Sequence, residues 1–135
     1  VCTTQTTNKN FDMVRAVTEK NQKRALDLYY DLLTLREPPM RILFLLAKQF
    51  RQICLTKKMS QEGLSQTEIA SKLGVPSFVV RNLTSCARSY TVEELENAVR
   101  DFVDAEEAVK TGTLGDVLSV ELLIVKYSSA RAVRA

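Results

Sequence analysis

The sequence contains no histidine among its 135 residues. That absence excludes Ser-His and Cys-His nucleophile pairs and the usual histidine-containing zinc sites. It also excludes the Glu-x-x-His pairs of a di-metal bundle, so we interpret the acidic run at 93–107, which includes Asp104 and Glu107, as a solvated face. The four glycines are isolated and form no phosphate-binding loop. We therefore expect no catalytic residues, no metal and no cofactor.

Glycine and proline are scarce, with four and three residues respectively, which favours helices joined by short connections. The three cysteines, Cys2, Cys54 and Cys86, are far apart and odd in number, so they suggest neither a disulfide framework nor a CxxC metal pair. Cys54 and Cys86 lie in apolar helical contexts. We interpret both as buried thiols in a reducing compartment and expect a cytoplasmic protein.

Long apolar runs are also absent. The longest run, at 42–47, is far too short to span a bilayer, and we expect no membrane association. The polar start of the chain, at 1–10, does not resemble a signal peptide. Because the first residue is not methionine, we expect a fragment of a longer polypeptide.

The apolar residues recur with helical spacing, and no segment alternates with a period of two. We predict an all-α bundle of about six or seven helices. Residues 1–9 are expected to be a linker or disordered, 10–127 the helical domain, and 128–135 a loose tail. The predicted helices begin or end at capping and breaking residues and cover about 10–20, 21–36, 39–59, 65–74, 76–90, 91–110 and 116–127.

Some of these helices are more apolar than a one-sided core requires. Residues 42–47, in the first half of the third helix, are expected to be enclosed by other helices. The helix at 116–127 is apolar nearly all round, and it either closes the core or packs on another subunit. In the first helix, Phe11, Val14 and Val17 are predicted to form the inward stripe.

Residues 64–90 have the pattern of a helix-turn-helix unit. Ser65 and Glu68 are spaced as a capping box, Gly74 can end the first helix, and Pro76 can open the second. Two helices joined by three or four residues with a glycine in the turn describe this motif. The pattern leaves a DNA-binding regulator and a structural hairpin as alternatives.

The outward face of the second helix distinguishes these alternatives. Phe78, Arg81, Asn82 and Ser85 are predicted to point away from the buried stripe. Arg81 and Asn82 could contact bases, but an exposed phenylalanine at the tip suits a protein contact better. The unit also carries a net charge of only +2, which is low for phosphate binding. We therefore take these four residues as the candidate protein interface.

The charge of the chain is unevenly distributed. Residues 1–92 hold 14 Lys or Arg and 7 Asp or Glu, whereas residues 93–135 hold 5 and 9. A dipolar chain of this kind suits docking between complementary surfaces at least as well as it suits binding a polyanion. An adaptor bundle in an unrelated assembly remains a third interpretation.

The order of the motifs resembles the C-terminal domain of the bacterial DNA polymerase III delta subunit. The resemblance covers roughly residues 10–127. It rests on the ordered segments 37–39 (EPP), 42–43, 47–51 (AKQFR), 63–65, 68–70, 72–75 (KLGV), 76–79 (PSFV), Asp104, 108–112 (AVKTG) and 120–123 (VELL). Each segment is weak alone, whereas their order and spacing are more specific.

The resemblance implies a role in the clamp loader of the replicative polymerase, a DNA-directed DNA polymerase holoenzyme. In that family the C-terminal helical domain joins those of the other loader subunits in a collar, and the delta subunit is not an active ATPase. An N-terminal region of AAA type contacts the sliding clamp and is absent from this chain. The expected function is therefore non-catalytic oligomerisation, with loader subunits as direct partners, the clamp reached through the absent region, and DNA contacted only indirectly.

Overall fold

The computed structural model describes residues 2–129, with side chains from residue 9 onward. Within this part the chain forms helices joined by short turns and contains no strand, which confirms the all-α prediction. The helices are α1 (Cys2–Thr18), α2 (Gln22–Thr34), α3 (Pro39–Gln61), α4 (Gln66–Leu73), α5 (Ser77–Ala87), α6 (Val92–Lys110) and α7 (Asp116–Ser128).

The two ends of the domain differ from the sequence-based expectation. Helix α1 begins at Cys2, where we expected a linker up to residue 9. No glycine or proline interrupts residues 2–18, so the helix continues through a polar segment of only moderate helix propensity. At the other end, Ser128 still belongs to α7. The predicted tail at 130–135 lies outside the described residues.

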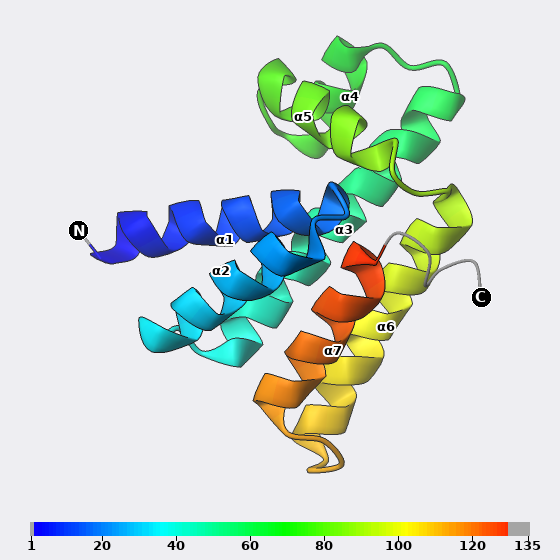
Figure 1. Ribbon diagram of the computed structural model, residues 1–135. Coiled ribbons are helices and arrows are strands. Elements are labelled where there is room, and N and C mark those ends of the chain that lie inside the picture. Colours follow the sequence, from blue (N-terminus) through cyan, green and yellow to red (C-terminus); the bar gives the residue numbers. More distant parts are fainter. Residues whose placement is uncertain (1, 130–135) are drawn as a thin grey trace.

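Helix α3 is the central element of the bundle. It packs against α1, α4, α5, α6 and α7. Figure 1 shows α3 passing behind α2 and α7, with α6 and α7 side by side and α4 and α5 together at one end of the molecule. Because α3 contacts both groups of helices, it joins the α4–α5 end to the remainder of the bundle.

Aromatic rings fill the core where α3, α5, α6 and α7 meet. The ring of Phe50 on α3 lies 5.6 Å from that of Tyr90, 5.2 Å from that of Phe102 and 5.9 Å from that of Tyr127, measured between centroids. The Phe50 ring packs edge-on against Tyr90 and Phe102, which is the arrangement that the ring quadrupole favours. This cluster fixes the end of α5 to α6 and α7.

A second, smaller core belongs to α4 and α5. It consists of Ile69, Ala70 and Val80, with Met59, Leu64, Leu73 and Val75 partly buried around them. Farther along α5, Leu83 and Ala87 belong to the main core. The helix-turn-helix unit therefore has its own apolar interior and is attached to the bundle through the C-terminal half of α5.

Several apolar residues that we expected inside are exposed. Phe11 is 52% exposed and Phe44 is 63% exposed, so the predictions of an inward Phe11 and an enclosed first half of α3 are wrong. Phe44 is exposed because the other described helices leave one side of α3 uncovered, and Phe11 is exposed because it lines an open groove between α1, α3 and α5. Helix α7 closes the core through Val120 and Ile124, whereas Leu122 on its outer side is 52% exposed.

No helix in the described part of the chain is long and apolar enough to cross a membrane.

Candidate functional site

The local geometry of α4 and α5 follows from a few residues at their ends. The Ser65 hydroxyl accepts a hydrogen bond from the Glu68 backbone N–H at 3.2 Å, and the Glu68 carboxylate accepts one from the Ser65 N–H at 2.9 Å. These bonds lower the pKa of Glu68, the backbone N–H bond having the larger effect. Gly74 ends α4 in the left-handed conformation (φ 70°), and Pro76 precedes the first turn of α5. The predicted capping box and glycine stop are confirmed.

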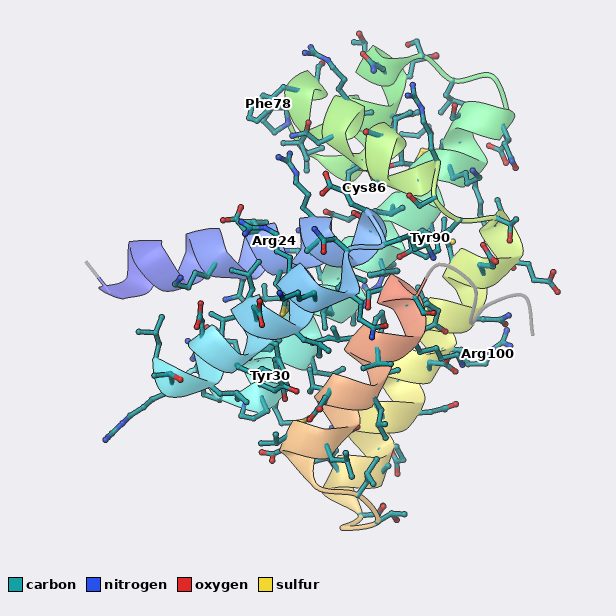
Figure 2. All side chains as sticks on the ribbon, in the orientation of Figure 1. Arg24, Tyr30, Phe78, Cys86, Tyr90 and Arg100 are labelled. Atoms are coloured by element: carbon teal, nitrogen blue, oxygen red, sulfur yellow. The ribbon has the colours of Figure 1, made fainter. Side chains whose placement is uncertain are left out.

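The outward face of α5 lies where the sequence placed it. Phe78 is 59% exposed, and Arg81, Asn82 and Ser85 are also exposed. Figure 2 shows Phe78 at the outer edge of α5. The orientation of this face is thus confirmed, while its role as an interface stays a prediction.

Phe78 and Asn82 line a groove between α5, α1 and α3. The groove has a volume of about 500 Å³. Helix α1 contributes Phe11, Asp12 and Arg15, and α3 contributes Lys48, Gln49 and Gln52. Two exposed phenylalanines, Phe11 and Phe78, thus line one apolar groove with cationic residues beside it. An apolar side chain of another protein is the kind of group that such a groove accommodates.

The remaining candidate residues are not all in this groove. Ser85 and Asn82 line a smaller polar pocket of about 120 Å³, together with Arg15 and Glu19 of α1. Arg81 lines neither the groove nor the small pocket. The sequence missed the contribution of α1 and α3, because the helical period of α5 gives the direction of its face but not the neighbours across from it.

The C-terminal end of α5 is held by a buried tyrosine. The Tyr90 hydroxyl lies 2.7 Å from the Tyr127 carbonyl oxygen at the end of α7 and 3.1 Å from the Val17 carbonyl oxygen at the end of α1. The Lys20 ammonium lies 4.0 Å from the centre of the Tyr90 ring and 3.4 Å from the Tyr127 carbonyl oxygen. Burial raises the pKa of Tyr90 and lowers that of Lys20. Tyr90 therefore joins the ends of three helices (Figure 2).

The outer face of α5 gives little support to the hypothesis that residues 64–90 bind a DNA duplex. In a helix-turn-helix reader the first residues of the second helix reach base edges. Here the corresponding side chain is the exposed Phe78, beside an apolar groove. Residues 64–90 contain Glu68, Lys72, Arg81 and Arg88 as their only charged side chains. That density of positive charge is low for phosphate contacts.

The metal-ligating and thiol side chains of the described residues form no cluster. No group of three or more His, Cys, Asp or Glu residues within them could hold a metal ion. Cys54 is buried, and desolvation raises the pKa of its thiol, which disfavours the reactive thiolate. The Cys86 sulfur accepts a hydrogen bond from the Thr18 hydroxyl at 3.4 Å. Both thiols are explained by packing.

Comparison with known proteins identifies the family. Residues 7–127 match the family model for the DNA polymerase III delta subunit, C-terminal domain. The chain belongs to this family. Because the match covers nearly the whole chain, it confirms the resemblance that the ordered motifs indicated, and the domain can be compared with its relatives as a single unit.

Two relatives from Bacillus subtilis extend the comparison. DNA polymerase III subunit delta of strain 168 is 31% identical over 116 residues, which are 86% of this chain and 33% of that protein. The solved structure of the Bacillus subtilis DNA clamp loader delta protein (YqeN) has a TM-score of 0.82 and 30% identity, covering 89% of this chain and 35% of that one. The chain thus spans about a third of the length of these relatives.

Proposed function

We propose that the domain is the non-catalytic oligomerisation domain of a clamp-loader delta subunit, which helps to assemble the complex that loads the sliding clamp during DNA replication. The observation that carries this proposal is the family match over residues 7–127. Exposed apolar side chains on α3, α5 and α7 support it, because assembly with other subunits would bury them.

The names of the relatives also indicate a role for the whole protein that contains this domain. The relatives are named as a DNA polymerase III subunit and as a DNA clamp loader protein. We propose that this protein is a subunit of a DNA-directed DNA polymerase holoenzyme in the cytoplasm. Its direct partners through the collar are other loader subunits, its contact with the sliding clamp is made by an N-terminal region, and it reaches DNA only as part of the complex.

A sequence-specific DNA-binding regulator is the alternative that residues 64–90 first suggested. Neither the family match nor the two relatives support it. The face that would enter the major groove carries Phe78, with Arg81 and Asn82 as its base-reading candidates. We therefore assign this face to protein contact and propose that Phe78, Arg81, Asn82 and Ser85 meet another loader subunit.

Mixing experiments with purified subunits test the oligomerisation role. The full-length delta subunit would be combined with the other loader subunits of the same organism, and the mass of the mixture measured by light scattering. The proposal expects a complex, whereas a delta subunit that stays monomeric with every partner at micromolar concentration would refute it. A duplex titration in parallel tests the alternative, which requires binding that depends on Arg81 and Asn82 and weakens steeply with salt.

The variant Phe78→Asp tests the proposed face of α5. A carboxylate placed at a contact between apolar groups must be desolvated without a partner, so assembly should weaken about tenfold or more. The far-ultraviolet circular dichroism should be unchanged, because the side chain is mostly exposed. Leu35→Asp, at an exposed leucine after α2, is the matched control. Equal assembly of the two variants would remove Phe78 from the interface.

A further inference from the structure

Helix α3 carries an exposed stripe on the side opposite the core. Its members are spaced three or four residues apart, so they follow one face of the helix. Phe44 and Leu55 are 63% and 39% exposed, and Lys48 and Arg51 between them are exposed as well. Arg100 and Val103 continue this surface on α6. We call these six residues the α3 face: Phe44, Lys48, Arg51, Leu55, Arg100 and Val103.

The two helices that form the α3 face are fixed side by side. Phe50 of α3 and Phe102 of α6 pack edge to face in the core, and the Lys58 ammonium lies 2.5 Å from the Glu96 carboxylate at the surface. Arg51, Leu55 and Arg100 line one shallow pocket of about 300 Å³. The α3 face is therefore a continuous surface that involves two helices.

The charged members of the α3 face are all positive. Helix α3 contains five basic residues and no acidic one. Lys58 forms a salt bridge with Glu96, and Glu96 also interacts electrostatically with Arg100. Lys48 and Arg51 form no salt bridge with any described residue. A partner that covers this face without leaving buried charges unpaired must supply carboxylates.

The apolar members of the face exclude a partner that is only an anion. Phe44 and Val103 are each more than half exposed, and Leu55 lines a pocket together with Arg51 and Arg100. Phosphates would pair with the cations, but Leu55 and Val103 are aliphatic, offer no ring on which a base could stack, and would be left without apolar contacts. Protein interfaces, in contrast, are enriched in aromatic residues and arginine. The composition of the face therefore fits an acidic protein surface better than a nucleic acid.

The opposite side of the domain has the complementary character. Helix α7 lies across the core from the α3 face and exposes Val117, Leu118 and Leu122 beside Asp116 and Glu121 (Figure 1). A domain with a basic apolar side and an acidic apolar side suits head-to-tail contacts, in which different surfaces of neighbouring domains meet.

We infer that the α3 face binds an acidic helical surface with exposed aliphatic side chains on a neighbouring clamp-loader subunit. This inference rests on the proposed oligomerisation function and deepens it, because it names the surface and the chemistry of the partner. The contact would pair Lys48, Arg51 and Arg100 with carboxylates and bury Phe44, Leu55 and Val103 among aliphatic groups.

Two substitutions on the α3 face test the inference in the full-length delta subunit. Arg51→Glu reverses a charge and Phe44→Ser removes an apolar ring, and both residues are exposed, so the fold should be retained. Each should weaken assembly with the other loader subunits of the same organism about tenfold or more. The controls are Arg24→Glu on α2, which makes the same charge reversal, and Leu35→Ser directly after α2, which also replaces an exposed apolar side chain with serine. Both should assemble within about twofold of wild type.

Affinities would be measured by surface plasmon resonance at low and high salt, with thermal melts to confirm folding. The inference expects high salt to weaken wild type more than Arg51→Glu, because the variant lacks one of the attractive charges. If wild type assembles and both α3-face variants assemble equally well, the inference is overturned while the oligomerisation function stands. If wild type binds no loader subunit, the proposed function fails and the inference fails with it.

A titration with single-stranded and duplex DNA tests whether the α3 face binds a nucleic acid instead of an acidic protein surface. Should Arg51→Glu lose DNA affinity while its assembly is unchanged, the α3 face would be a polyanion surface and the inference would be wrong. Unchanged DNA binding together with weakened assembly supports an acidic protein partner.

Discussion

The buried hydroxyl of Tyr90 is the most informative single group for testing how the helix ends are held together. Tyr90 is only 3% exposed, and its hydroxyl lies within hydrogen-bond distance of carbonyl oxygens at the ends of α1 and α7. Tyr90→Phe keeps the ring, its packing on Phe50 and its contact with Lys20, and removes only the hydroxyl. The substitution thus isolates the contribution of the hydrogen bonds.

The expected cost follows from what each carbonyl keeps after the change. The Val17 carbonyl still accepts a bond from the Lys20 N–H at 3.1 Å, and the Tyr127 carbonyl remains 3.4 Å from the Lys20 ammonium. Neither carbonyl oxygen is left without a partner. The substitution should therefore lower the free energy of unfolding by about 1–2 kcal/mol, which is the net value of one hydrogen bond plus the partial desolvation of the two carbonyl oxygens. For a domain of this size that corresponds to a melting temperature lower by about 3–8 °C.

Urea unfolding followed by far-ultraviolet circular dichroism measures this difference. Tyr30→Phe is the matched control, because its hydroxyl donates to the Glu121 carboxylate at 2.8 Å on the exposed side of α2. An exposed bond of this kind competes with water, so its loss should change the free energy of unfolding much less than the loss of the buried Tyr90 hydroxyl does. If Tyr90→Phe costs no more than Tyr30→Phe at an unchanged denaturant slope, the hydroxyl does not hold the helix ends and this reasoning is wrong.

Two further predictions concern backbone strain and pH. Arg36 is exposed with φ 66°, so Arg36→Gly should raise the free energy of unfolding by about 0.5–1 kcal/mol in urea titrations. Lys20→Gly, at φ 63°, should show no such gain because it also removes the contact with Tyr90; equal gains would refute this account. Burial raises the pKa of Tyr29, Tyr90 and Tyr127 above the ordinary value. The stability that these buried neutral tyrosines contribute to the fold is fully present below the unfolded-state pKa of about 10 and is lost as the pH rises beyond it. The free energy of unfolding, measured at increasing pH up to about 11, should therefore fall. A constant value would contradict the prediction.

The helix ends were predictable because their determinants are local. The capping boxes that begin α4 and α6 are formed by residues three apart, and each was recognisable as Ser or Thr followed by Glu. Gly74 ends α4 for the same local reason, since it adopts a positive φ without steric cost. The start of α1 was missed because no strong capping residue marks it; the helix extends simply because nothing interrupts it.

The candidate site was only partly predictable, because a surface depends on which helices become neighbours. The period of α5 correctly placed Phe78 and Arg81 outward. It could not indicate that Phe11 of α1 and Lys48 of α3 lie across the groove from Phe78. The same limit explains the error at Phe44: an apolar residue can be recognised in the sequence, but only the packing of the other helices decides whether it is covered.

The helix-turn-helix pattern shows why shape alone did not determine function here. Its recognisable features, a capped first helix, a glycine in the turn and a small core around Ile69, Ala70 and Val80, are requirements for packing two short helices together. The outer face of the second helix takes no part in that packing, so its residues can vary and can suit different kinds of partner. Recognition therefore has to be inferred from side chains that the motif leaves unconstrained. Near the start of α5 the largest of these is Phe78, an exposed apolar ring beside an apolar groove. That ring favours contact with protein over contact with base edges, as the family assignment does independently.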